Sequence, residues 1–156
     1  MLAESPAWHN GADATPCRPS VLELQALDIY RTTCKPSAQL QKPHAMAGVN
    51  IIAADTDAEA QHLYISLQMR FADMAKGERG FMKSPIDNIE TYWSGPEKAQ
   101  AQAQRMLACS FVGSPKTLRR ELKAFITKTG ADELMVATAV YDHGARLRSY
   151  ELLAGV

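Results

Sequence analysis

The positions where this chain could do chemistry are polar side chains near the ends of its predicted strands. Asp142 follows the strand-like segment 134–140. The active sites of β/α barrels gather at the carboxyl ends of strands, so Asp142 is a candidate catalytic residue. An aspartate at the start of a helix also serves as its N-cap, which explains Asp142 without any chemistry. The sequence favours capping and leaves catalysis as the alternative.

Asn50 and Ser114 are the two candidates for binding a cofactor. Asn50 lies inside the apolar segment 47–54, so its amide needs a partner, either a side chain of a neighbouring strand or a ligand in a pocket. Ser114 precedes Pro115 at a predicted helix N-terminus, where free N–H groups could hold a phosphate. A capped helix with a solvated basic face explains the same residues. The sequence favours that interpretation, because no GxGxxG or Walker motif is present.

Composition argues against several other classes of protein. The 156 residues suffice for one domain with a core, and 17 basic residues balance 17 acidic ones. This balance gives no reason to expect a nucleic acid or an anionic membrane as partner. The four histidines and three cysteines have no metal-ligand spacing, so no metal site is predicted, and a reduced, cytoplasmic chain is expected. No segment has the length or apolar character of a membrane span, and residues 1–17 lack the features of a signal peptide.

Strands that run directly into capped helices are the repeated feature of the chain. Segment 47–54 is typical of a strand buried on both faces of a parallel sheet, and Thr56 with Glu59 forms a capping box for a helix over 56–76. The pattern returns as a strand at 110–112 with a helix over 115–129, and as a strand at 134–140 with a helix ending near residue 154. A helix over 20–33 precedes all three units. This alternation predicts an α/β fold, either a β/α barrel or an open doubly wound sheet.

Two regions depart from this pattern. We expect an irregular or disordered N-terminal tail over residues 1–19 and a folded domain over 20–156. Residues 77–95 form a long irregular stretch before another helix that begins at Pro96, and such loops are often lids or binding loops. The alternative is that its aromatic residues pin it to the outside of the fold.

Buried stripes are predicted for the two longest helices from apolar residues at spacings of three and four. The predicted stripe of the helix over 56–76 consists of Ala60, Leu63, Tyr64, Leu67, Phe71, Met74 and Ala75. That of the helix over 115–129 consists of Leu118, Leu122, Phe125, Ile126 and Thr129.

Five segments resemble luciferase-like flavin-dependent monooxygenases in their order and spacing. They are IYR (29–31) with KPS (35–37), GVN (48–50) with AADTDAEA (53–60), VGSP (112–115), TGADELMV (129–136), and YD (141–142) with RSYE (148–151). The resemblance implies a partial (β/α) TIM-type barrel of the bacterial-luciferase kind, comprising its C-terminal βα units only. It also implies an enzyme that uses reduced FMN and O2 to oxidise a small organic substrate, with a flavin reductase as partner.

A complete barrel of this type needs about 250 residues. The resemblance therefore implies that the N-terminal strands, with much of the flavin pocket, have no counterpart in this chain. We expect little activity from the chain alone, and either self-association or a need for a complementing N-terminal chain, because an open piece of barrel exposes strand edges. The alternative is a non-catalytic α/β interaction module that keeps the scaffold, with Tyr92 and Trp93 of the loop 77–95 in its contact surface.

Overall fold

The computed structural model describes residues 19, 21–93 and 97–156. In chain order the elements are α1 (Val21–Thr33), β1 (Met46–Ala53), α2 (Asp57–Ala75), the short 3-10 helix η1 (Ile89–Thr91), α3 (Glu97–Leu107), β2 (Ser110–Gly113), α4 (Pro115–Thr129), β3 (Glu133–Ala137) and α5 (His143–Ala154). The prediction of three βα units preceded by one helix is confirmed. Residues 1–18 of the tail predicted over 1–19, and the expected helix starts at Ser20 and Pro96, lie outside the described residues. Pro19, the last residue of that predicted tail, is described and is buried.

A parallel three-stranded sheet with the order β2-β1-β3 forms the centre of the fold. The central strand β1 pairs on both sides, so that Asn50 lies opposite Ser110 of β2 and Ala137 of β3. Ile51, Ile52 and Ala53 are at most 1% exposed, as expected of a central strand with cover on both faces. The amino-terminal part of β1 differs, since Met46 and Gly48 are exposed.

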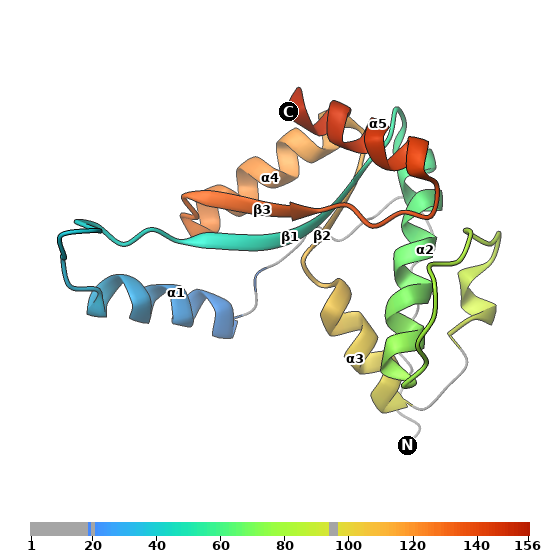
Figure 1. Ribbon diagram of the computed structural model, residues 1–156, viewed down its shortest axis with the longest axis horizontal. Helices are drawn as coiled ribbons and strands as arrows, with labels where there is room; N and C mark the ends of the chain where they lie inside the picture. Colours follow the sequence, from blue (N-terminus) through green and yellow to red (C-terminus); the bar gives the residue numbers. More distant parts are fainter. Residues whose placement is uncertain (1–18, 20, 94–96) are drawn as a thin grey trace, which may run out of the picture.

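The helices cover both faces of this sheet. Val49, Ile51 and Phe111 pack with α4 and with the end of α5, whereas Ile52 and Val112 pack with α2. Figure 1 shows α4 and α5 above the sheet and α2 with α3 below it. Across the sheet, the chain moves in one direction from β1 to β2 and in the opposite direction from β2 to β3. Because crossovers between parallel strands are right-handed, the helices of these two connections lie on opposite faces of the sheet. In a run of three consecutive barrel strands, by contrast, β2 would be central.

The predicted buried stripes are confirmed in large part, with two errors. Met74 is 43% exposed and Ile126 is 40% exposed, so both assignments were wrong. The second half of α2 packs on α3 and the following loop instead of the sheet, which buries Ala72 beside Trp93 and turns Met74 outward. In α4 the contact with the sheet is narrow, so Phe125 is buried and the adjacent Ile126 is not.

The described part of the long loop, residues 77–93, is attached to α2 along its length. Gly77 has a φ of 82° and ends the helix in the left-handed conformation. Arg70 donates to the carbonyl oxygen of Gly80 at 2.8 Å, and the Tyr92 hydroxyl donates to Asp73 at 2.6 Å. Trp93 is only 5% exposed. These contacts support the prediction that aromatic residues pin the loop, and they remove Trp93 from any contact surface.

Candidate functional site

The carboxyl end of the sheet brings the predicted candidates Ser114 and Asp142 to one edge, together with aspartates of the β1–α2 connection. The connections after β1 and β2 leave toward opposite faces, which is where open α/β sheets form a ligand crevice. Here Asp57 of α2 crosses that crevice. Its Oδ1 accepts the backbone N–H of Ser114 at 2.6 Å, and its Oδ2 accepts the Thr117 hydroxyl at 3.1 Å.

Gly113 makes this close approach possible. A Cβ atom on Gly113 would lie 2.8 Å from Asp57 Oδ1 and 2.9 Å from Thr117 Cγ2, closer than side-chain atoms are found. The hydrogen bond from the Ser114 N–H is the main reason that the pKa of Asp57 is lowered, so the carboxyl is charged at neutral pH. A carboxylate thus occupies the N-terminus of α4, where a phosphate would otherwise bind.

Ser114 itself is the N-cap residue of α4, but its side chain does not cap the helix. Its hydroxyl lies 3.5 Å from that of Thr117. Because the charge of Asp57 already occupies this helix N-terminus, a second anion at Ser114 would be repelled. The geometry therefore fits the capped-helix interpretation better than a phosphate site.

Asp142 takes the capping role that the sequence favoured. It is the N-cap of α5, and its Oδ1 accepts the backbone N–H of Ala145 at 2.7 Å. Nearby, Arg148 of α5 pairs with Asp55 at 2.7 Å, and this hydrogen bond is the main cause of the lowered pKa of Asp55. Asp55, Asp57 and Asp142 thus all make structural contacts at this edge.

Asn50 lies on the face of the sheet against which α2 packs. This helix covers only part of that face. Its amide donates to the Ser110 hydroxyl at 3.4 Å, so its partner is a side chain of the neighbouring strand, the first of the two predicted possibilities. Alternation along β1 places Met46 and Gly48 on the same face as Asn50, with Met135 opposite Gly48. Met46 is 48% exposed and Met135 is 62% exposed. The pair of Asn50 and Ser110 therefore borders an uncovered apolar surface, which we call the open face.

Two buried hydroxyls that the sequence analysis did not single out hold the carboxyl end of β1. Thr138 donates to the carbonyl oxygen of Ile51 at 2.8 Å, and Ser149 accepts the N–H of Ala53, also at 2.8 Å. These backbone groups face the side of β1 where β3 has already ended. Thr138 was predicted to lie within that strand. Instead β3 ends before Thr138, and the Thr138 hydroxyl makes the hydrogen bond to β1 that the backbone of a longer strand would have made. In the sequence, a threonine within an apolar run is a weak indication of a buried hydrogen-bonding role. Nothing in the sequence indicates this role for Ser149.

The described residues were compared with the requirements of a metal site and of a membrane-spanning helix, and they meet neither. Among residues 19, 21–93 and 97–156, no group of three histidine, cysteine or acidic side chains could hold a metal ion. In the same part of the chain, no helix is long and apolar enough to cross a membrane.

Comparison with known proteins shows which proteins the chain resembles. No family model matches the chain. A luciferase-like monooxygenase of Escherichia coli K12 is 43% identical over 133 residues, which cover 85% of this chain and 39% of that protein. The protein YvbT of Bacillus subtilis, described as uncharacterized, is 41% identical over the same shares of both chains.

A solved structure agrees with this relationship. The crystal structure of apo-MsnO8 superimposes with a TM-score of 0.69 at 30% identity, over 86% of this chain and 40% of that one. The chain thus spans about two fifths of the length of the relatives that it matches. Over most of its length the chain is therefore similar to part of a luciferase-like monooxygenase.

Proposed function

We propose that the chain is the C-terminal part of a luciferase-like β/α barrel whose complete form is an FMN-dependent monooxygenase. Sequence identity over 85% of the chain supports the family, and the open face supports a missing remainder. Among the described strands, β2 and β3 each pair only with β1, so each has an edge to which a further strand could bond. Strands from outside this chain would pair with these edges and cover Met46 and Met135.

The residues present fit a flavin only in part. The Asn50 amide, half-buried beside the open face, could hydrogen-bond the polar edge of a flavin ring. Ser114 does not fit the phosphate, because Asp57 holds a negative charge there. Residues outside this chain would have to hold the phosphate of FMN. Oxidation of a small organic substrate with O2, supply of reduced flavin by a reductase, and a cytoplasmic location belong to the same proposal.

Titration of the purified chain with FMN, followed by flavin fluorescence and combined with sizing, tests this function. We expect no saturable binding by the chain alone, and saturable binding once the N-terminal portion of the Escherichia coli relative is added. Asn50→Ala should weaken that binding, whereas Gln104→Ala, an exposed position on α3, should not. Absence of binding by the mixture would overturn the proposal, and so would a monodisperse monomer that binds FMN tightly without it.

A non-catalytic interaction module is the second candidate function. The hydrogen bonds of Asp57 and Asp142 favour it, because each carboxylate accepts a backbone N–H within the protein. The predicted contact surface needs correction, since Trp93 is buried and Tyr92 bonds to Asp73. Phe81, which is 97% exposed, is the aromatic residue that this loop does present. A chain that never gains flavin, even with its missing portion, would favour this module.

A further inference from the structure

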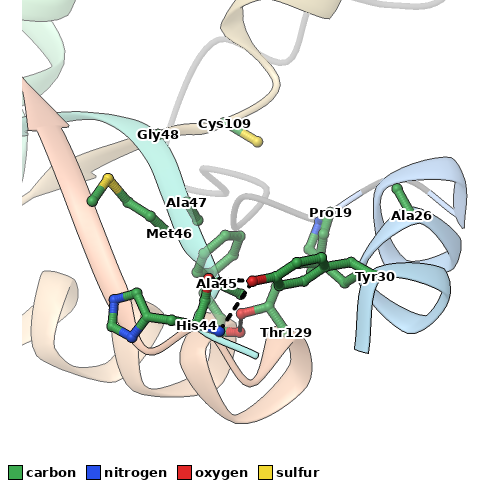
Figure 2. A pocket seen from close by; sticks show the side chains of 12 residues that line it. Pro19, Ala26, Tyr30, His44, Ala45, Met46, Ala47, Gly48, Cys109 and Thr129 are labelled. Carbon is green, nitrogen blue, oxygen red and sulfur yellow. Dashed lines mark hydrogen bonds between the residues drawn. The ribbon is translucent and has the colours of Figure 1, made fainter. Parts of the chain in front are cut away.

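A cavity of about 430 Å³ separates α1 from the amino-terminal end of the sheet. Figure 2 shows α1 on one side, with Ala26 and Tyr30 at the cavity, and the first residues of β1 on the other. The walls are mainly apolar and include Ala26, Leu27, Ala45, Ala47 and Phe125. Because α1 faces a cavity instead of closely packed side chains, it gains little of the dispersion energy that close packing provides.

Burial along α1 agrees with a weak attachment. None of its described side chains, those of residues 24–33, is buried. Leu27 is half-buried at the cavity, whereas Ile29 is 63% exposed. A helix of 13 residues is marginal by itself in water and depends on packing of an apolar face. The polar contacts between α1 and the rest of the protein are therefore important for holding it in place.

Two side chains near the carboxyl end of α1 make such contacts. The Tyr30 hydroxyl donates to the carbonyl oxygen of His44 and accepts the His44 N–H, both at 3.2 Å. The Arg31 guanidinium donates to the carbonyl oxygen of Gly130 at 2.7 Å. Both sites are exposed to solvent, so water competes for these groups and each bond contributes modestly.

The connection from α1 to β1 has the features of a hinge. Residues 35–42 are all exposed. They contain a local turn, in which the Ser37 N–H donates to the Leu40 carbonyl oxygen at 2.9 Å and the Ser37 hydroxyl accepts the Leu40 N–H at 3.1 Å. The chain is fixed again at Ala45, whose N–H donates to Asp132 Oδ2 at 2.8 Å and whose carbonyl oxygen accepts the Asp132 N–H at 2.9 Å. Bending within residues 35–42 leaves these bonds of Ala45 intact.

We propose that α1 is a hinged cover that opens and closes over this cavity. In the closed form, which the structure shows, α1 shields residues 46–48 of β1. These residues line the cavity and, among the described residues, have no strand beside them on the β2 side. Covering a free strand edge with a helix is one way in which proteins prevent pairing with other chains. Opening breaks the bonds of Tyr30 and Arg31 and exposes this edge together with the apolar wall.

The Cys109 thiol lines the cavity and can report on opening independently of any flavin binding (Figure 2). The chain has three cysteines, so Cys17→Ser with Cys34→Ser leaves Cys109 as the single thiol. In this background we expect Ellman's reagent to label Cys109 at least about tenfold more slowly than in the urea-unfolded chain. Tyr30→Phe and Arg31→Ala each remove one contact of α1. Each should speed labelling about two- to tenfold, as expected for the loss of one exposed hydrogen bond.

Arg119→Ala is the matched control for Arg31→Ala. It also removes a guanidinium hydrogen bond to a backbone carbonyl oxygen, that of Gly155 at 2.6 Å, and neither residue lines the cavity. The labelling rate of Cys109 should be unchanged in this variant. Urea separates opening of α1 from global unfolding, because opening exposes little surface and labelling should then depend only weakly on urea below the unfolding transition.

Four results would overturn this proposal. Labelling of Cys109 in the background chain as fast as in the unfolded chain means that α1 does not cover the cavity. A rate that neither Tyr30→Phe nor Arg31→Ala changes means that these contacts do not hold the cover. A rate that Arg119→Ala raises as much as Arg31→Ala, or one that increases steeply with urea, means that labelling follows global unfolding.

Discussion

Replacing Ser149 with alanine tests whether the side-chain hydroxyl beyond the end of β3 stabilises the central strand. Ser149 is 0% exposed, and its hydroxyl is the acceptor for the N–H of Ala53, which is 1% exposed. Alanine would leave this N–H buried without its acceptor. The loss is expected to cost about 1–3 kcal/mol of the free energy of unfolding. For a domain of this size that corresponds to roughly 2–10 °C in Tm.

Ser66 on α2 provides a matched control of the same substitution. It is also 0% exposed, but its hydroxyl has no hydrogen-bonding partner among the described residues. A buried hydroxyl without a partner is unfavourable, so Ser66→Ala should be neutral or stabilising. Both serines lie within α-helices, so the gain in helix propensity is common to the two variants and cancels in the comparison.

Urea unfolding monitored by far-UV circular dichroism gives both values, with the denaturant slope confirming that each variant unfolds like the parent. The expected result is a clear loss of stability for Ser149→Ala and none for Ser66→Ala. Equal losses for the two variants would refute the reasoning, because the effect would then follow from burial alone. Thr138→Val offers a second measure, since it removes the hydroxyl that bonds the Ile51 carbonyl oxygen while keeping the side-chain volume.

Three further predictions concern the carboxyl edge and the pinned loop. Because the pKa of Asp57 is lowered in the fold from its ordinary 3.8, its contribution to stability is present above about pH 4 and is lost as pH falls through the folded pKa. The stability difference between the parent and Asp57→Asn, measured by urea unfolding, should therefore shrink on acidification, and a difference that grew would contradict this. Gly113→Ala should destabilise the fold by about 1–3 kcal/mol in the same assay, because its Cβ would meet Asp57 at 2.8 Å. Tyr92→Phe removes a hydrogen bond to the buried Asp73 and should speed proteolysis within residues 78–88, whereas Phe81→Ala at a 97% exposed position should leave stability unchanged.

Attachment of the loop to α2 buries the carboxylate of Asp73. Electrostatic interactions within the loop explain why this burial is tolerated. Burial by itself raises the pKa of Asp73, but hydrogen bonds from Tyr92 and Lys83 outweigh this effect and lower it overall. Lys83 lies 2.9 Å from Asp73 and carries a raised pKa, chiefly through its hydrogen bond to Tyr92, so the pair is charged at neutral pH. Because Asp73 is buried and paired, removing one partner is expected to cost more than breaking an exposed ion pair would.

Local patterns in the sequence determined the elements of this protein. The run of apolar residues at 47–54 identified the central strand, and capping residues such as Thr56 and Asp142 located helix starts to within a residue. These features depend on neighbours within a few positions, so a single sequence contains them in full. The family resemblance likewise rests on residues that stand in order along the chain, and the relatives of the chain confirm it.

Only the tertiary structure decided how these elements meet. The strand order β2-β1-β3 could not be predicted, because crossover direction depends on packing between elements that are far apart in sequence. That order brings Asp57 to the N–H of Ser114, which fills the helix N-terminus that the sequence left open for a phosphate. Thr138 and Ser149 bond the backbone at the carboxyl end of β1, and they can do so because β3 stops three residues earlier than its apolar pattern predicts. Hydrophobic spacing fixes which residues can be buried, and long-range packing fixes what they are buried against.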